Sequence, residues 1–101
     1  MKEYKGKISV IVPAFNEERH ITENIKEIIK VLDEAASDYE VVIVDDGSHD
    51  ETYEKALDAC KHLGNVKVIR SHANLGKGNA LKHGFKFVSG NLVAFLDADL
   101  D

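Results

Sequence analysis

The sequence has few of the residues that cross-link a chain or anchor it in a membrane. Cys60 is the one cysteine among 101 residues, which rules out a disulfide within the chain and fits a reducing compartment. No apolar run approaches the roughly 20 residues of a membrane-spanning helix. Residues 1–7 lead into a short apolar strand and not into the apolar core of a signal peptide. The sequence therefore predicts a cytoplasmic protein.

Acidic side chains are missing from residues 61–90, which carry 6 basic ones, whereas residues 1–60 carry 7 basic and 15 acidic side chains. Two interpretations remain open. The basic segment is either a solvated helix face or a loop that the fold brings near an anionic ligand. Nucleic acid is not an expected partner, because the net charge is −5 and no aromatic residues alternate with the lysines.

Length and composition indicate one globular domain, with 44% hydrophobic and 31% charged residues. Near-continuous apolar runs are typical of strands buried on both faces of a parallel sheet. Such runs predict strands at 8–13, 40–46, 66–71 and 91–99. Helical patterns between them give a β-α-β-α-β-α-β order. We expect an α/β fold, a doubly wound, Rossmann-like parallel sheet of about four strands with helices on both faces. The strand order is left open.

Apolar side chains recur at three- and four-residue spacing in three segments, the first of them an expected helix at about 17–36. The stripes are Ile21, Ile25, Ile28, Ile29 and Leu32; Tyr53, Leu57, Cys60 and Leu63; and Ala80, Leu81, Gly84, Phe85 and Val88. We expect Tyr53, Cys60 and the phenylalanine of these stripes in the core. Asn16 can cap the first helix, and Ser48 with Glu51 has the spacing of a capping box for the second.

Every predicted strand runs into a cluster of polar and glycine residues. The clusters are PAFNEE at 13–18, DDGS at 45–48, SHANLGKGN at 71–79 and DADLD at 97–101. Open α/β sheets bind ligands outside the carboxyl ends of their strands. One such cluster can be a turn with helix caps, but four on the same edge predict a binding site.

The first two clusters contain residues that neither a turn nor a helix cap requires. Phe15 is an aromatic residue in a polar loop and can offer a stacking face. In the second cluster Gly47 supplies the turn and Ser48 a cap, so neither task needs Asp45 and Asp46. Paired carboxylates after the second strand can accept hydrogen bonds from a base or a ribose.

The third cluster contains NLGKGN, which matches neither a Walker A loop nor a dinucleotide fingerprint. It predicts a tight entry to a helix whose N-terminus favours anions, with Lys77 close by. In the fourth cluster, Asp97, Asp99 and Asp101 share a face if the strand continues, and their mutual repulsion favours a bound cation. We expect a divalent cation, held by one or two carboxylates and substrate phosphates. The alternative is an acidic, solvent-facing strand end.

In this order and spacing, PAFNEE, VIVDDGSHDET, NLGKGNALKHG and FLDADLD resemble the nucleotide-sugar-binding half of family-2 glycosyltransferases with the GT-A fold. The closest likeness is to the dolichyl- or polyprenyl-phosphate sugar synthases. The resemblance implies a nucleoside pocket, with Asp46 reading the base. The residues implied for this pocket are Pro13, Phe15, Glu17, Val44 and Asp46.

The resemblance also implies a D-x-D motif at Asp97, Ala98 and Asp99. Asp97 and Ala98 would contact the donor, and Asp97 and Asp99 would bind Mg²⁺ or Mn²⁺, Asp99 above all as a direct ligand. In the family, the GKGNA segment shapes the donor site near the sugar and the diphosphate. We extend this role to Lys77 and expect it to contact the donor diphosphate. Many relatives have tyrosine at position 15, and Phe15 keeps the stacking face without the hydroxyl.

The implied reaction is metal-dependent transfer of a sugar, with inversion, from a GDP- or UDP-sugar to a lipid-phosphate or glycan acceptor. The family's acceptor residues lie beyond the D-x-D motif. We therefore expect residues 1–101 to be a donor-binding domain, truncated before the acceptor half and inactive alone. The full-length enzyme would act at the cytoplasmic face of a membrane. An exposed sheet edge would favour self-association of the fragment.

Two other classes of protein use related motifs and remain the alternatives. A haloacid-dehalogenase-type phosphatase or phosphotransferase also places D-x-D after an apolar strand, but after its first strand. A receiver-like signalling module has paired acids after strand one, where this sequence has Pro13, and a phosphorylated aspartate after strand three, where it has RSHAN. Both fit less well than the transferase.

Overall fold

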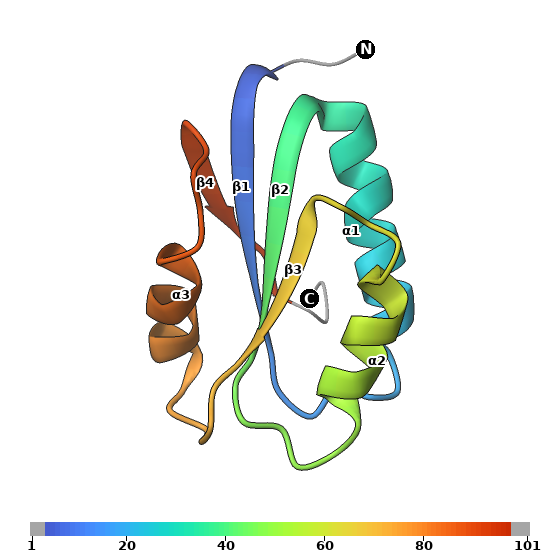
Figure 1. Ribbon diagram of the computed structural model, residues 1–101, viewed down its shortest axis with the longest axis vertical. Helices are drawn as coiled ribbons and strands as arrows, with labels where there is room; N and C mark the ends of the chain where they lie inside the picture. Colours follow the sequence, from blue (N-terminus) through green and yellow to red (C-terminus); the bar gives the residue numbers. More distant parts are fainter. Residues whose placement is uncertain (1–3, 98–101) are drawn as a thin grey trace.

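Strands and helices alternate along the chain in the computed structural model, which describes residues 4–97 (Figure 1). The strands are β1 (Tyr4–Ala14), β2 (Ala36–Asp45), β3 (Val66–Arg70) and β4 (Leu92–Phe95). The helices are α1 (Ile21–Ala35), α2 (Thr52–Cys60) and α3 (Lys77–Phe85). The predicted order of elements is confirmed.

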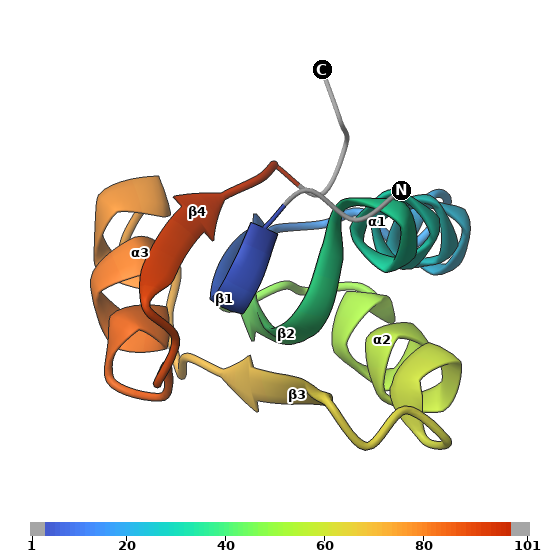
Figure 2. The ribbon, with the colours of Figure 1, turned by 90° about the horizontal axis from the view of Figure 1, so that it is seen from above.

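The four strands form one parallel sheet in the order β3-β2-β1-β4. β1 and β2 lie at its centre and pair along most of their length, ending at Ala14 opposite Asp45. α1 and α2 cover one face of the sheet, and α3 covers the other (Figure 2). The doubly wound architecture is thus confirmed, and the structure supplies the strand order that the sequence left open.

Two hydrophobic clusters fill the two faces of the sheet. The larger includes Val10, Val12, Ile21, Ile25, Ile28, Val41, Ile43 and Ala56, and the smaller consists of Ile11, Val42, Val44 and Ala80. On the second face α3 packs very close to the strands. A Cβ on Gly84 would lie 2.7 Å from Cγ2 of Ile11 and 3.0 Å from Cγ2 of Val44. The glycine therefore sets how closely α3 approaches the sheet.

The first apolar stripe is confirmed, but the other two hold only in part. The buried strips are Thr52, Ala56 and Cys60 in α2 and Ala80 and Gly84 in α3. Phe85 was expected in the core, yet it is 56% exposed, and Leu57 of the second stripe is 41% exposed. These nine-residue helices touch the sheet along narrow strips at four-residue spacing, so a side chain one position away points off the strip. Tyr53 instead packs beneath the guanidinium of Arg70, which lies 4.7 Å from the ring centroid.

Apolar side chains are also exposed beside β4, at the edge of the sheet. Phe95 is 54% exposed and shares a shallow groove with Phe85 and Leu81. Self-association through this edge stays a prediction.

Within residues 4–97, no helix is both long and apolar enough to cross a bilayer.

Both predicted helix caps are wrong, because the side chains concerned hold loops instead. α1 begins at Ile21 and α2 at Thr52, and neither has a side-chain cap. The backbone N–H of Asn16 donates to Oγ of Ser48 at 2.8 Å, and Oδ1 of Asn16 accepts from the backbone N–H of His49 at 2.9 Å. The loops after β1 and β2 are therefore tied to each other.

Midway along β1 and β2, the largely buried carboxylate of Glu40 holds the segment before β4 against β1. It accepts hydrogen bonds from the hydroxyl of Ser9 and from the backbone N–H of Ser89, the latter at 2.6 Å, and lies 3.5 Å from Nζ of Lys7. The Ser9 hydroxyl also accepts from the N–H of Gly90 at 2.8 Å. Burial raises the pKa of Glu40, but the hydrogen bonds and the Lys7 charge outweigh it, so the pKa lies below its ordinary value of 4.5.

We expect Glu40→Gln to lower the free energy of unfolding by about 1–3 kcal/mol at neutral pH, because a charged acceptor is lost. Since the folded-state pKa is depressed, this stabilisation is present above the unfolded value and is lost as the pH falls through the folded value. Urea unfolding at neutral pH and near pH 3 should show the gap between wild type and variant narrowing in acid.

Glu27→Gln, at an exposed position of α1, is the matched control and should change stability by less than about 0.5 kcal/mol. An equal difference in the free energy of unfolding between wild type and Glu40→Gln at both pH values would show that the charge of Glu40 does not stabilise the fold.

Candidate functional site

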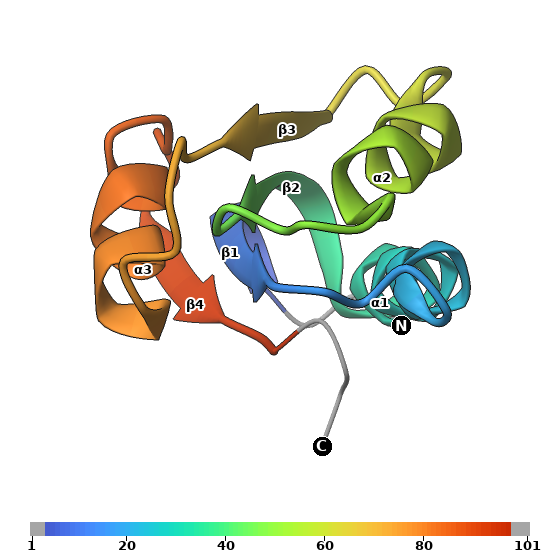
Figure 3. The same cartoon turned by 90° about the horizontal axis from the view of Figure 1, so that it is seen from below.

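The loops after β1, β2 and β3 and the end of β4 meet at one edge of the sheet, which Figure 3 views directly. A cleft of about 210 Å³ opens there, lined by Pro13, Ala14, Phe15, Glu17, Asp46, Asn74, Gly76, Lys77 and Asp97. All four clusters noted in the sequence contribute to it. Complete small-molecule sites measure roughly 300–1,000 Å³, so the cleft accounts for part of the site of a larger ligand.

The structure brings most of the predicted site residues together. Those that line the cleft are Pro13, Phe15, Glu17, Asp46, Lys77 and Asp97. Val44 does not line it, because its side chain is fully buried beneath α3, on a strand covered on both faces. Ala98 and Asp99 lie outside the described residues. Asn74 lines the cleft but was missed, although a polar amide in the loop after the third strand was a signal for it.

The carboxylate of Asp46 holds the loop that leads into α3. Its Oδ1 accepts from the backbone N–H of Leu75 at 3.2 Å, and its Oδ2 accepts from that of Gly76 at 3.0 Å. Only 4% of the residue is exposed, so these bonds compensate for burying the charge. A carboxylate offers about four acceptor positions. Asp46 can therefore hold the loop and still accept a hydrogen bond from a ligand in the cleft.

Gly47 makes this contact between loops possible. Its φ is +76°, in the left-handed region that favours glycine, and a Cβ there would lie 2.5 Å from the carbonyl carbon of Ala73 and 2.6 Å from the nitrogen of Asn74. The residue is thus needed for the close approach of the two loops as well as for the turn.

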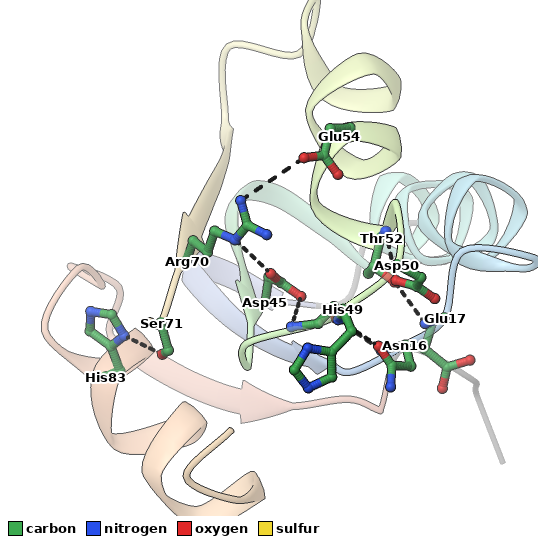
Figure 4. A network of polar contacts seen from close by, with 11 residues as sticks. Asn16, Glu17, Asp45, His49, Asp50, Thr52, Glu54, Arg70, Ser71 and His83 are labelled. Atoms are coloured by element: carbon green, nitrogen blue, oxygen red, sulfur yellow. Dashed lines mark hydrogen bonds and ion pairs between the residues drawn. The ribbon is translucent and has the colours of Figure 1, made fainter. Parts of the chain in front are cut away.

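Side chains of the loop after β2 also fix the loop after β1 (Figure 4). The N–H of Glu17 donates to Oγ1 of Thr52 at 2.8 Å, and the N–H of Glu18 donates to Oδ2 of Asp50 at 3.3 Å. Burial raises the pKa of Asp50, but hydrogen bonds from Thr52 and Glu18 outweigh it and hold the pKa below its ordinary value of 3.8. The charged carboxylate therefore helps to keep Glu17 facing the cleft.

Asp45, the first of the paired aspartates, points into the interior and not into the cleft. It is 1% exposed, and its Oδ1 accepts from the N–H of Ser48 at 3.3 Å. Its Oδ2 accepts no hydrogen bond from the described residues but forms an ion pair with Nε of Arg70 at 3.3 Å, and Arg70 also lies 3.9 Å from Glu54 (Figure 4). Asp45 thus ties β2 to β3, whereas Asp46 serves the cleft.

The aromatic ring at the mouth of the cleft belongs to Phe15, which is 37% exposed. It meets His49 in an edge-to-face contact, with ring centroids 6.3 Å apart and planes at 77°. The contact positions the ring, and its exposed surface can stack on a planar ligand.

A cation and a carboxylate face each other where β4 ends. Nζ of Lys77 lies 2.6 Å from Oδ1 of Asp97, which shows that the position beside this oxygen suits a cation. Carboxylate oxygens are ligands that Mg²⁺ and Mn²⁺ prefer. Within residues 4–97, no three His, Cys, Asp or Glu side chains are grouped so that they could hold a metal by themselves. The donor set therefore fits a metal bound by one or two carboxylates together with substrate phosphates.

We expect Gly47→Ala to lower the free energy of unfolding by about 2–4 kcal/mol, because the left-handed φ and the clash with Ala73 both oppose a side chain. The amide protons of Leu75 and Gly76 should also exchange faster, since the loop loses its contact with Asp46. Denaturant unfolding and hydrogen exchange measure the two effects.

The matched control is Gly64→Ala, where no atom lies within 4 Å of the added Cβ. It should leave stability unchanged or raise it by up to about 1 kcal/mol. Equal losses in the two variants would contradict the close approach at Gly47.

Curated relatives match nearly the whole chain. It is 37% identical over 95 residues to the undecaprenyl-phosphate 4-deoxy-4-formamido-L-arabinose transferase of Enterobacter sp. (strain 638), covering 93% of this chain and 29% of that protein. It is 42% identical over 96 residues to the dolichol-phosphate mannosyltransferase of Pyrococcus furiosus, covering 93% of this chain and 26% of that protein. The chain thus spans less than a third of the length of these relatives.

Solved structures agree with this likeness. The mannosyltransferase PcManGT from Pyrobaculum calidifontis, in complex with GDP-Man and Mn²⁺, matches with a TM-score of 0.85 and 28% identity, over 95% of this chain and 28% of that chain. S. aureus TarS 1–349, in complex with UDP-GlcNAc, matches with a TM-score of 0.79 and 36% identity, over 92% of this chain and 26% of that chain.

A family-wide sequence model gives the same result. The model described as Glycosyl transferase family 2 matches residues 9–100, a range that contains the first three motifs and most of the fourth. The family and GT-A fold inferred from those motifs are confirmed, and neither the phosphatase nor the receiver alternative gains support. The chain belongs to glycosyl transferase family 2.

Proposed function

We propose that this chain is the donor-binding region of a metal-dependent glycosyltransferase that moves a sugar, with inversion, from a GDP- or UDP-sugar to a lipid phosphate. The observation that carries the proposal is the convergence of Phe15, Asp46, Lys77 and Asp97 on one cleft at the carboxyl edge of the sheet. The complexes of PcManGT with GDP-Man and of TarS with UDP-GlcNAc support both donor bases. The relatives named for undecaprenyl and dolichol phosphate support the acceptor class.

Each of these residues has a role that its position allows. Phe15 stacks on the base, and Asp46 accepts a hydrogen bond from it while it holds the loop before α3. Lys77, at the N-terminus of α3, binds the donor diphosphate. Asp97, together with Asp99, would hold Mg²⁺ or Mn²⁺, and the cation would supply positive charge to neutralise the leaving nucleoside diphosphate.

The acceptor chemistry needs little from these residues. A lipid phosphate is already ionised near neutral pH, so its attack on the sugar requires no strong general base. A sugar hydroxyl would require one. Because the relatives are more than three times as long as this chain, we propose that transfer needs residues of the parent enzyme beyond these. We also propose that the parent enzyme acts at the cytoplasmic face of a membrane, where a polyprenyl phosphate is within reach.

We expect calorimetry with Mn²⁺ to show binding of GDP or UDP to the wild type. Asp97→Ala and Asp99→Ala should each weaken that binding by about tenfold or more, because a metal ligand is lost. Asp58→Ala is the matched control. It removes a carboxylate on the exposed side of α2 that pairs with Lys61, and it should leave binding unchanged.

Undiminished binding by both D-x-D variants would remove these residues from the proposed metal site.

A thermal-shift series distinguishes a glycosyltransferase from a phosphoryl-transfer protein. Stabilisation by beryllofluoride with Mg²⁺, and by neither nucleotide nor nucleotide-sugar, would favour a phosphoryl-transfer protein over a glycosyltransferase.

A further inference from the structure

The shortest ion pair among the described residues lies in the cleft itself. Nζ of Lys77 is 2.6 Å from Oδ1 of Asp97, and the two side chains are 63% and 38% exposed. Both residues line the cleft. The pair therefore places a cation at the carboxylate that the proposed metal would use.

Backbone contacts fix both partners of this pair. Lys77 follows Gly76, whose N–H is held by Asp46 at 3.0 Å. On the other side, the N–H of Leu96, next to Asp97, donates to the carbonyl oxygen of Ile11 at 3.0 Å. The backbone beside each partner is thus anchored, which keeps the two side chains within reach of each other.

An ammonium group and a divalent cation cannot share one carboxylate oxygen without strong repulsion. Both carry positive charge, and the repulsion is only partly screened at the separations that joint binding to Asp97 would impose. A metal at Asp97 therefore competes with the ammonium group of Lys77 for the charge of the carboxylate. The diphosphate of a nucleotide can offer Lys77 a second anion at the N-terminus of α3.

We propose that Lys77 is an internal counter-ion that occupies the cation position at Asp97 until the metal and the nucleoside diphosphate bind together. This proposal rests on the function proposed above and assigns its site a further property. The metal alone binds weakly, because it competes with the Lys77 charge at the Asp97 carboxylate. The metal with a diphosphate binds well, because Lys77 exchanges one anion for another. Lys77 is thus a positioning residue that couples metal binding to nucleotide binding, and the coupling is reciprocal.

The test is the affinity for Mn²⁺ in the absence of nucleotide, measured from the electron paramagnetic resonance signal of free Mn²⁺. Lys77→Met is expected to bind Mn²⁺ roughly two- to fivefold more tightly than the wild type, the size of effect that a partly exposed ion pair has. Lys77→Arg keeps a cation beside Asp97 and should stay near the wild type. Lys82→Met removes an exposed charge from the same helix, outside the cleft, and should also stay near the wild type.

A second measurement is the ratio of Mn²⁺ affinities with and without UDP or GDP. This ratio should be smaller in Lys77→Met than in the wild type, because both the competition and the diphosphate contact are gone. Circular dichroism checks that each variant is folded. Mn²⁺ binding by Lys77→Met that equals or falls below the wild type, while the wild type binds Mn²⁺ with nucleotide, would overturn this inference alone. A wild type that binds neither nucleotide with Mn²⁺ would overturn the proposed function, and this inference with it.

Discussion

The contact between the Asp46 carboxylate and the two amides at the entry to α3 is the interaction on which the site depends. Hydrogen bonds to a charged acceptor contribute about 1.5–3 kcal/mol each, more than neutral ones do. This pair fixes the residue before Lys77, and Gly47 allows the loops to come close enough for the bonds to form. Together with the close packing of α3 on β1 and β2, the contact sets the distance between Lys77 and the loop that carries Phe15.

The same segment organises the opposite wall of the cleft. Ser48, Asp50 and Thr52 accept the backbone N–H groups of residues 16–18, so one loop after β2 orients the loops after both β1 and β3. Its acidic character therefore has a structural cause in addition to any role in binding. The charges of two carboxylates that line the cleft are compensated by neighbouring groups. Two amides compensate Asp46, and Lys77 compensates Asp97.

The periodic features of the fold were predictable, and the features that depend on distant partners were not. Apolar runs and stripes predicted the order of elements, because each pattern depends only on the residues of one strand or helix. The caps failed because Ser48 and Asn16, which could have closed local turns, bond across 32 and 33 residues instead. The position of β4 beside β1 depends on Ser9 and Glu40 meeting residues 89–90, which no local pattern reveals. The cleft was predictable because parallel strands end at one edge, but the inward side chain of Val44 was not.

The basic segment 61–90 shows how the fold selects among charges. Of its 6 basic residues, Lys77 is the one that lines the cleft. Arg70 is engaged by Asp45 and Glu54, and Lys82 lies in the last turn of α3, where a cation stabilises the helix dipole. Most of the segment therefore matches the solvated or structural interpretation, and a single lysine matches the ligand-binding one. What distinguishes that lysine is its place at the start of α3, next to the Gly76 amide that Asp46 holds, and not the surplus of basic residues around it.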